Sequence, residues 1–137
     1  MNTAMQMVCT YLDSKGVRYS PNEEKSTIKT GFKAENKQGI ELLLIFDDNN
    51  ESMAIRSFDY VSFPANKIDT MYKVCSQMNK QFRWVKFYVD ENDNTVTLSE
   101  DAVIQLDTAG AEAWELIVRM VSIGDDAYPE FMKALWS

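Results

Sequence analysis

The sequence predicts an α+β fold in which helices accompany a mostly antiparallel sheet of five strands. Apolar residues recur at helical spacing in three segments, and strand-like runs of apolar residues lie between them. The predicted elements follow the order α-β-β-β-α-β-β-α, which lacks the strict strand–helix alternation of parallel sheets. The chain of 137 residues is long enough for a single domain, 1–137, whose core needs no disulfide or metal.

The first predicted helix covers residues 2–14. Its apolar stripe has the spacing i, i+3, i+4, i+7 and consists of Met5, Val8, Cys9 and Leu12. Asn2 or Thr3 is suited to cap its start, and Gly16 is placed to end it. The polar stretch "YSPNEE" that follows is typical of a loop.

Three strands are predicted next. The run "STIKTGFKAE" is a modest strand, and "NKQG" separates it from "IELLLIF". The second run is apolar at almost every position from Leu42 to Phe46, which indicates a central strand or one with both faces buried. In the third, "MAIRSFDYVSF", the large residues change parity, so we expect a bulge near Arg56–Ser57.

A second helix is predicted to begin at Pro64, a residue favoured in the first helical turn. Its apolar face would carry Ile68, Met71, Tyr72, Cys75 and Met78.

The segment "FRWVKFYVDENDNTVTLSED" predicts a β-hairpin with "ENDN" as its turn. In this register Val96 lies opposite Val89, and Leu98 lies opposite Phe87. Val85 shares the face of Phe87, and the same parity continues along the second strand through Ala102, Ile104 and Leu106.

The last helix is predicted to begin at Thr108, with Glu112 near the capping-box position. One face carries Ala113, Ile117, Met120, Gly124, Ala127, Phe131 and Ala134. Gly124 and Pro129 favour a break or kink, which would divide this segment into two helices.

Composition excludes several kinds of chemistry. The chain has no histidine, which removes Ser–His and Cys–His catalysis and histidine-ligated metals. Its five glycines are not clustered, so no phosphate-binding loop is present. Cys9 and Cys75 lie in apolar helical patterns typical of buried, reduced thiols. We predict no cofactor.

The formal net charge of -7 argues against nucleic-acid binding. No apolar run reaches the length of a membrane span, and the N-terminus lacks the basic and apolar regions of a signal peptide. We therefore expect a cytoplasmic protein without membrane or nucleic-acid partners.

One polar stretch spells part of a calcium-binding loop. Asp90, Asn92, Asn94 and Asp101 fall at positions 1, 3, 5 and 12 of such a loop. Position 6 holds Thr95 instead of glycine, and the flanking segments read as strands. A polar hairpin turn explains the same residues, so we predict no metal site.

A partner-binding surface is predicted on the hairpin. If Val85, Phe87 and Val89 face the helices, then Trp84, Lys86 and Tyr88 project from the opposite face. Aromatic side chains of this kind are common at protein interfaces. Trp114 on the last helix extends the candidate surface, although a second layer of the same chain could equally cover Trp84.

The C-terminal half resembles a known family. The aromatic-rich hairpin, preceded by "CSQMNKQ" and followed by a helix ending "DDAYPEFMKAL", resembles the YbjN family of putative bacterial sensory-transduction regulators. The positions that match are Asn79, Phe87–Tyr88 and Tyr128–Pro129, within Ile68–Leu135. The resemblance implies a two-layer α/β sandwich similar in fold to type III secretion chaperones, often dimeric, and it implies no enzymatic activity.

These observations favour a non-enzymatic module that binds a protein partner or a second copy of itself. The alternative is a sensor that admits a small apolar ligand between sheet and helices, beside Met71, Tyr72 and Met120. A hydrolase or transferase that uses carboxylates alone is a third possibility. It would require a cleft that gathers at least two acidic side chains with perturbed titration.

Overall fold

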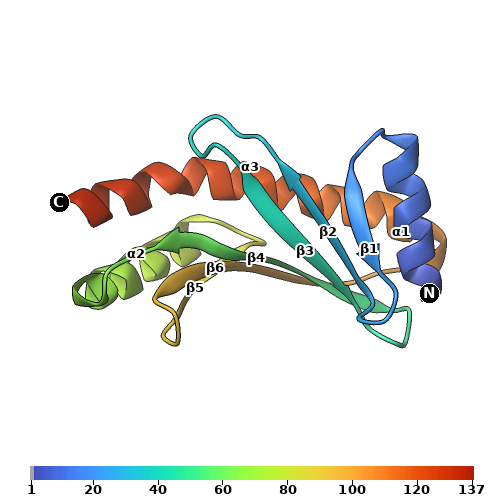
Figure 1. The fold of residues 1–137 in the computed structure, drawn as a ribbon, viewed down its shortest axis with the longest axis horizontal. Coiled ribbons are helices and arrows are strands. Elements are labelled where there is room, and N and C mark those ends of the chain that lie inside the picture. Colours follow the sequence, from blue (N-terminus) through green and yellow to red (C-terminus); the bar gives the residue numbers. More distant parts are fainter. Residues whose placement is uncertain (1) are drawn as a thin grey trace.

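The computed structural model describes residues 2–137 as three α-helices and a six-stranded antiparallel sheet (Figure 1). The helices are α1 (Thr3–Ser14), α2 (Ile68–Gln81) and α3 (Ala109–Trp136). The strands are β1 (Tyr19–Asn22), β2 (Thr27–Phe32), β3 (Ile40–Phe46), β4 (Ser52–Ser62), β5 (Lys86–Asp90) and β6 (Thr95–Val103). Short 3-10 turns, Ala65–Lys67 and Leu106–Thr108, lead into α2 and α3. The α+β class is confirmed.

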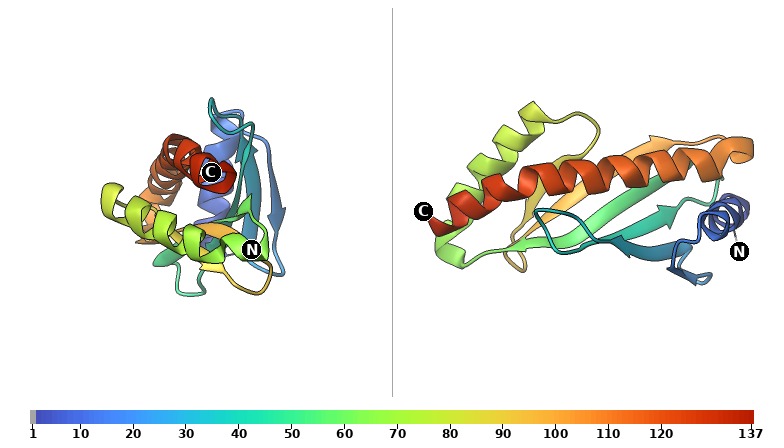
Figure 2. Two further views of the ribbon diagram at one scale, coloured as in Figure 1. Left: turned by 90° about the vertical axis from the view of Figure 1, so that its left-hand side faces the viewer. Right: turned by 90° about the horizontal axis from the view of Figure 1, so that it is seen from above.

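The sheet has the order β1-β2-β3-β4-β6-β5, and α3 runs along one of its faces (Figures 1 and 2). The helix α1 packs beside the first part of α3, and α2 packs against β5 and α3. One apolar core joins the inner face of the sheet to all three helices. We call the face turned away from α3 the outer face.

The central strand β3 shows how the helices bury only one face of the sheet. Ile40, Leu42, Leu44 and Phe46 are buried. Leu43 and Ile45 between them are half-buried, because they point to the outer face. The interior position of this strand, between β2 and β4, is confirmed. Of the two alternatives predicted for this run, the structure shows the central strand and not the strand with both faces buried.

The predicted number of five strands was wrong, because the sheet has six: "YSPNEE", predicted to be a loop, contains a strand. Its first residues form β1, which pairs with β2 from Tyr19↔Thr30 to Asn22↔Thr27. Three of its four residues are exposed, so no apolar alternation marks it. Pro21 lies in it without breaking the ladder, since an edge strand needs hydrogen bonds on one side only.

Local signals at the two ends of α1 were interpreted correctly. The side chain of Asn2 accepts a hydrogen bond from the Met5 amide, and Gly16 follows the helix with φ +69°. The predicted apolar stripe of this helix is buried.

The helix α2 covers the free edge of β5. The Asn79 amide donates to the Phe87 carbonyl (3.0 Å), and its oxygen accepts from the Phe87 N–H (2.7 Å). This side chain therefore replaces a neighbouring strand at one position. Tyr72, predicted on the buried face of α2, is 40% exposed, and its hydroxyl donates to Glu91.

The last helix is continuous from Ala109 to Trp136, which corrects the predicted break. Gly124 lies on the buried face, where an added Cβ would be 2.9 Å from a methyl group of Leu98. Pro129 lies inside the helix, and the loop between β2 and β3 compensates for its missing N–H, as described below.

Both cysteines are buried and unpaired, as expected. Burial raises the pKa of the Cys75 thiol to about 12, which makes it a poor nucleophile.

Candidate functional site

The outer face carries a row of aligned residues from five strands. The registers Lys29↔Leu43, Leu43↔Arg56, Arg56↔Ser99 and Lys86↔Ser99 place these side chains side by side. Large apolar side chains lie close to this row, and Phe58 and Tyr88 are 47% and 43% exposed. The helix α3 lies on the opposite face of the sheet (Figure 2), and Tyr88 borders a groove that it shares with Tyr72 and Ser76 of α2.

A cleft opens where β3 and β4 separate. The two strands pair only from Leu43↔Arg56 to Phe46↔Met53, and β4 then bulges between Ser57 and Val61. Asp59 takes φ +56° within this bulge, which begins after Ser57 and so lies just beyond the Arg56–Ser57 position predicted for it. The sequence therefore predicted the irregularity but not the cleft that it produces.

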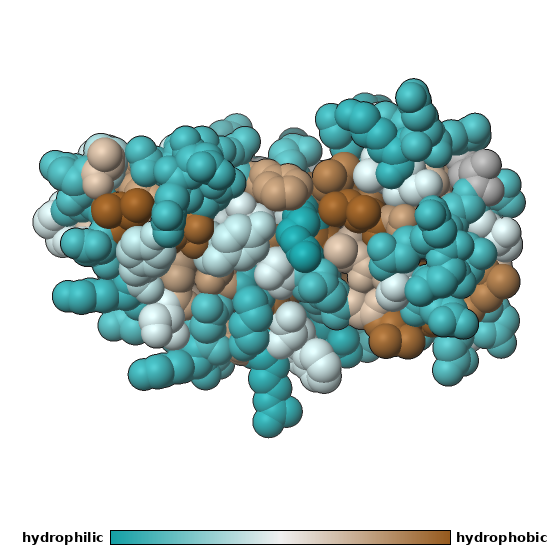
Figure 3. Space-filling view, turned by 90° about the horizontal axis from the view of Figure 1, so that it is seen from below, coloured by the Kyte–Doolittle hydropathy of each residue, from teal (hydrophilic) through white to brown (hydrophobic). Residues whose placement is uncertain are grey.

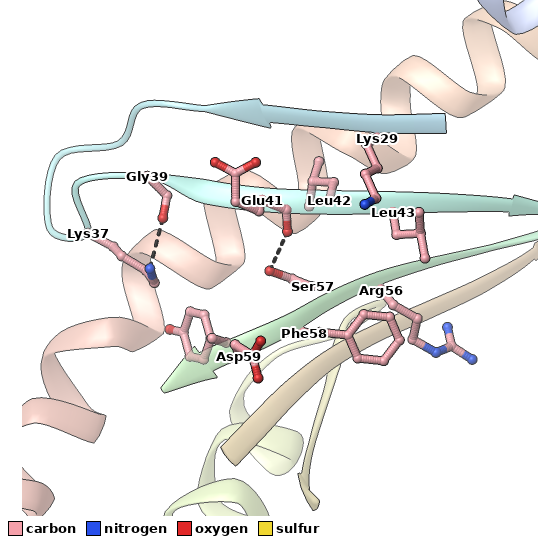
Figure 4. Close-up of a pocket in the computed structure, with 11 residues that line it drawn as sticks. Lys29, Lys37, Gly39, Glu41, Leu42, Leu43, Arg56, Ser57, Phe58 and Asp59 are labelled. Carbon is pink, nitrogen blue, oxygen red and sulfur yellow. Dashed lines mark hydrogen bonds between the residues drawn. The ribbon is translucent and has the colours of Figure 1, made fainter. Parts of the chain in front are cut away.

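The cleft has a volume of about 410 Å³. Apolar and charged side chains both line it (Figure 4). Its lining consists of Lys29, Lys37, Gly39, Glu41, Leu42, Leu43, Arg56, Ser57, Phe58, Asp59 and Tyr60.

Side chains satisfy the backbone groups that the separating strands leave unpaired. The Ser57 hydroxyl donates to the Glu41 carbonyl (2.7 Å), and the Lys37 ammonium donates to the Gly39 carbonyl (2.8 Å) (Figure 4). A carbonyl oxygen is not a base, so this arrangement does not activate Ser57 as a nucleophile.

The outer face is mostly hydrophilic, with apolar side chains gathered in separate areas (Figure 3). A band of hydrophilic side chains divides these areas. A partner on this face would meet apolar contacts surrounded by a polar rim, which is the anatomy of many protein interfaces.

A second groove, of about 310 Å³, lies on the other side of the sheet between β6 and α3. We call it the β6–α3 groove; it is lined by Trp84, Glu100, Asp101, Ala102, Val103, Glu112, Glu115, Leu116 and Arg119. Burial raises the pKa of the Glu100 carboxyl to about 7, although the nearby Arg119 guanidinium acts to lower it.

This groove gathers four acidic side chains, so it is the place to look for the carboxylate-only active site that the sequence left possible. Three of its four acidic side chains already have partners. Glu112 accepts from Thr108, Glu115 pairs with Arg119, and Asp101 pairs with Arg56. Glu100 has no second free carboxyl beside it among these four, so the groove does not supply an acid–base pair.

The predicted surface residues do not form one surface. Tyr88 and Lys86 lie on the outer face as predicted, but the Lys86 ammonium donates to the carbonyls of Asn79 and Phe82 at the end of α2 (both 2.9 Å). It therefore stabilises the helix terminus, where carbonyl groups lack partners.

Trp84 lies on the α3 side, which corrects its predicted position on the outer face. The Arg119 guanidinium carbon is 4.5 Å from the centroid of the Trp84 ring. Strand alternation does not extend to Trp84, because β5 begins at Lys86 and Trp84 takes φ +76°.

Trp114 also lies away from Tyr88. It is half-buried, with its ring edge-on to Phe32 (centroids 6.0 Å apart) and the Lys15 ammonium 5.4 Å from its centroid. It belongs to the contact of α3 with β2 and α1.

The residues proposed for a small-ligand pocket are not brought together as a lining. Met71 and Met120 are fully buried in the core, and Tyr72 is exposed beside Glu91.

The segment that resembles a calcium-binding loop forms the turn and second strand of the β5–β6 hairpin. Asp90 accepts from the Asn92 amide, whereas Asp101 lies at the far part of β6 and pairs with Arg56 (2.7 Å). Asp90 and Asp101 are thus on opposite ends of the hairpin. Within residues 2–137, no three carboxyl, thiol or imidazole groups gather as a metal site.

Sequence reasoning did not assign Phe58 or Glu100 to a site, and it treated Leu43 only as a member of the apolar run Leu42 to Phe46. A signal for Glu100 was present, because it occupies the parity of Val96, Leu98 and Ala102, the buried face of β6. A carboxyl group at such a position predicts either a buried partner or a functional role.

Comparison with known families gives one match over most of the chain. The family model YbjN, described as "Putative bacterial sensory transduction regulator", matches residues 5–133. The comparison with curated proteins gives no match. None of the helices in residues 2–137 is long and apolar enough to cross a membrane.

Solved structures share the fold at low identity. The E. coli protein YbjN, described as a putative transcription regulator, has a TM-score of 0.65 and 10% identity, with 92% of each chain covered. A chain of the ExsC–ExsE complex has a TM-score of 0.52 and 13% identity, covering 85% of this chain and 90% of that one.

A chain of the heterodimeric ExoU–SpcU complex from the type III secretion system of Pseudomonas aeruginosa has a TM-score of 0.51. Its identity is 17%, with 92% of this chain and 95% of that chain covered. The type III secretion chaperone-like fold is therefore confirmed.

Proposed function

The protein belongs to the YbjN family, and on this basis we propose that it is a non-enzymatic bacterial regulator that binds a protein partner through its outer face. In this proposal residues 1–137 act as one module in the cytoplasm. Regulation would follow from holding or releasing the partner.

The observation that carries the proposal is the uncovered apolar surface around the β3–β4 cleft. Leu43 and Ile45 are half-buried, and Phe58 is 47% exposed although it lies in the middle of the sheet. Full burial of one such side chain contributes about 1.5–3 kcal/mol, so a partner that covers several of them gains substantial affinity.

Related folds support a protein as the occupant. ExsC and SpcU have this fold, and the structures that contain them are complexes with ExsE and ExoU. Fold similarity does not transfer function by itself. Here it agrees with an open outer face and with a cleft that lacks an activated nucleophile.

The test is affinity capture from native cytosol with three forms of the protein: the parent, Phe58→Glu and Trp84→Glu. The two variants introduce the same charge at exposed aromatic positions on opposite sides of the sheet. We expect a protein retained by the parent and by Trp84→Glu, and lost with Phe58→Glu. Binding must then be reproduced with the purified partner.

Other outcomes are informative. If nothing is retained and the parent sediments as a dimer that Phe58→Glu converts to a monomer, the outer face binds a second copy of the chain. Equal binding and equal sedimentation of all three forms would show that this face is not the working surface.

A further inference from the structure

We propose that the β6–α3 groove is a binding site for a guanidinium group. The groove lies on the α3 side of the sheet, so this inference does not depend on the proposed function of the outer face. It rests on a buried carboxyl without a partner, an aromatic wall and an excess of acidic side chains.

Glu100 forms the floor of the groove. It is only 4% exposed, and neither carboxyl oxygen has a hydrogen-bond partner within residues 2–137. A buried carboxyl without a hydrogen bond is strongly unfavourable, and native proteins rarely retain one without compensation. An incoming donor would supply the missing bonds.

The rim of the groove provides the aromatic wall and the charge. Trp84 is 58% exposed and presents its ring to the groove. Glu112 and Glu115 add negative charge from α3, whereas Arg119 is the one cation in the lining; the Asp101 carboxylate pairs with Arg56 on the outer face. The lining therefore favours a cationic ligand.

A guanidinium group fits better than an ammonium group for two reasons. Its planar fork can donate two parallel hydrogen bonds to one carboxylate. Its face stacks on an indole ring, and the groove already shows this geometry, because the Arg119 guanidinium lies 4.5 Å from the Trp84 centroid.

Arg119 itself does not satisfy Glu100. Its Nη2 donates to Glu115 at 2.9 Å, and Glu115 is 65% exposed. An exposed i,i+4 ion pair and an exposed cation–π contact are both weak, so an incoming guanidinium group can displace Arg119 from Glu115 and from the Trp84 ring.

The test uses butylguanidine and its neutral, isosteric counterpart butylurea, titrated into the intact protein by calorimetry. The Trp84 indole N–H is followed by NMR and assigned with Trp84→Phe. We expect butylguanidine to bind the parent and to shift the Trp84 signal. Binding of butylurea should be weaker by a factor of ~10 or more, because the neutral group makes weaker hydrogen bonds to a carboxylate.

The decisive variant is Glu100→Gln, which keeps the side-chain shape and removes the charge. Its matched control is Glu24→Gln, the same change at an exposed residue of the β1–β2 turn. We expect Glu100→Gln to lose the binding of butylguanidine and the control to retain it. Circular dichroism establishes that both variants are folded.

A second pair of probes separates two sources of the same group. Acetyl-Gly-Arg-Gly-amide is compared with the peptide that carries citrulline, the neutral analogue of arginine. Binding of the arginine peptide identifies a side chain of a polypeptide as the ligand, and binding of butylguanidine alone identifies a small molecule. The proposal is overturned if neither cation binds, if the neutral analogues bind equally well, or if Glu100→Gln binds like the parent.

Discussion

The side-chain amide of Asn36 donates a hydrogen bond of 3.1 Å to the backbone carbonyl of Asp125. This carbonyl would accept from residue 129 in an uninterrupted helix, but Pro129 has no N–H. The contact reaches from the loop between β2 and β3 to α3 and repairs the helix where proline weakens it. It explains why α3 continues where a break was predicted.

The carboxylate of Asp125 strengthens the same contact. It accepts from the backbone N–H groups of Asn36 (2.7 Å), Lys37 (3.0 Å) and Glu35 (3.3 Å). The loop therefore has a fixed position on α3, and this position places Lys37 at the mouth of the β3–β4 cleft.

A double-mutant cycle tests the first contact. Asn36→Ala should destabilise the protein by about 1 kcal/mol in the parent, because it leaves the Asp125 carbonyl without a protein donor. In the Pro129→Ala background the same change should cost less, since residue 129 then supplies the N–H. Urea denaturation measures both values, and equal costs in the two backgrounds would contradict this account.

Glu100 should make the stability of the protein fall as pH rises. Its pKa is raised from 4.5 to about 7 in the folded state by burial, so the folded protein binds more protons than the unfolded chain between these values. The penalty is absent below about pH 4.5, grows as the pH rises from 4.5 to 7, and stays constant above that range because the carboxyl is then ionised in both states. At about 1.4 kcal/mol per pKa unit, this penalty reaches ~3 kcal/mol.

Glu100→Gln removes the ionisable group and should flatten this dependence. We expect the variant to gain about 2–3 kcal/mol of stability relative to the parent at pH 8 and to differ little at pH 5. Thermal unfolding across this range provides the measurement, with Glu24→Gln as the control. A parent and variant with parallel pH profiles would show that Glu100 does not titrate as described.

Asn79 should be essential to the edge of β5. Asn79→Ala leaves the N–H and carbonyl of Phe87 without this partner, and we expect a loss of about 1–2 kcal/mol. Asn79→Asp should be worse, because it replaces the donor facing the Phe87 carbonyl with a second acceptor. Hydrogen exchange at the Phe87 amide should accelerate in both variants; unchanged exchange would show that the amide does not need this acceptor.

Gly110 should not tolerate alanine even though alanine favours helices. An added Cβ would lie 2.5 Å from the Tyr11 Cβ, where the stem of the side chain cannot move aside without shifting α1. We expect overpacking to cost up to about 3 kcal/mol against ~1 kcal/mol gained in helix propensity, so Gly110→Ala should lose up to about 2 kcal/mol of stability in all. Gly39→Ala, where no atom lies within 4 Å, should be nearly neutral in the same unfolding experiment.

The sequence by itself determined the features that depend on local periodicity. The buried stripe of α1, the hairpin register Phe87↔Leu98 and the irregularity in β4 follow from the spacing of apolar residues. Such spacing specifies which side of an element is apolar, because side-chain direction repeats every 3.6 residues in a helix and every 2 in a strand. The family resemblance rested on the same hairpin and the last helix.

Only the tertiary structure decided which surfaces remain open and which polar groups lack partners. Trp84 lies on the α3 side of the sheet because its own backbone has φ +76°, which interrupts the strand alternation. The spacing of apolar residues does not predict such a turn. The exposure of Phe58 depends on where β3 and β4 separate, and Glu100 lacks a hydrogen-bond partner because Arg119 donates to Glu115 instead. Each of these is a relation between segments distant in sequence, so no single segment contains it.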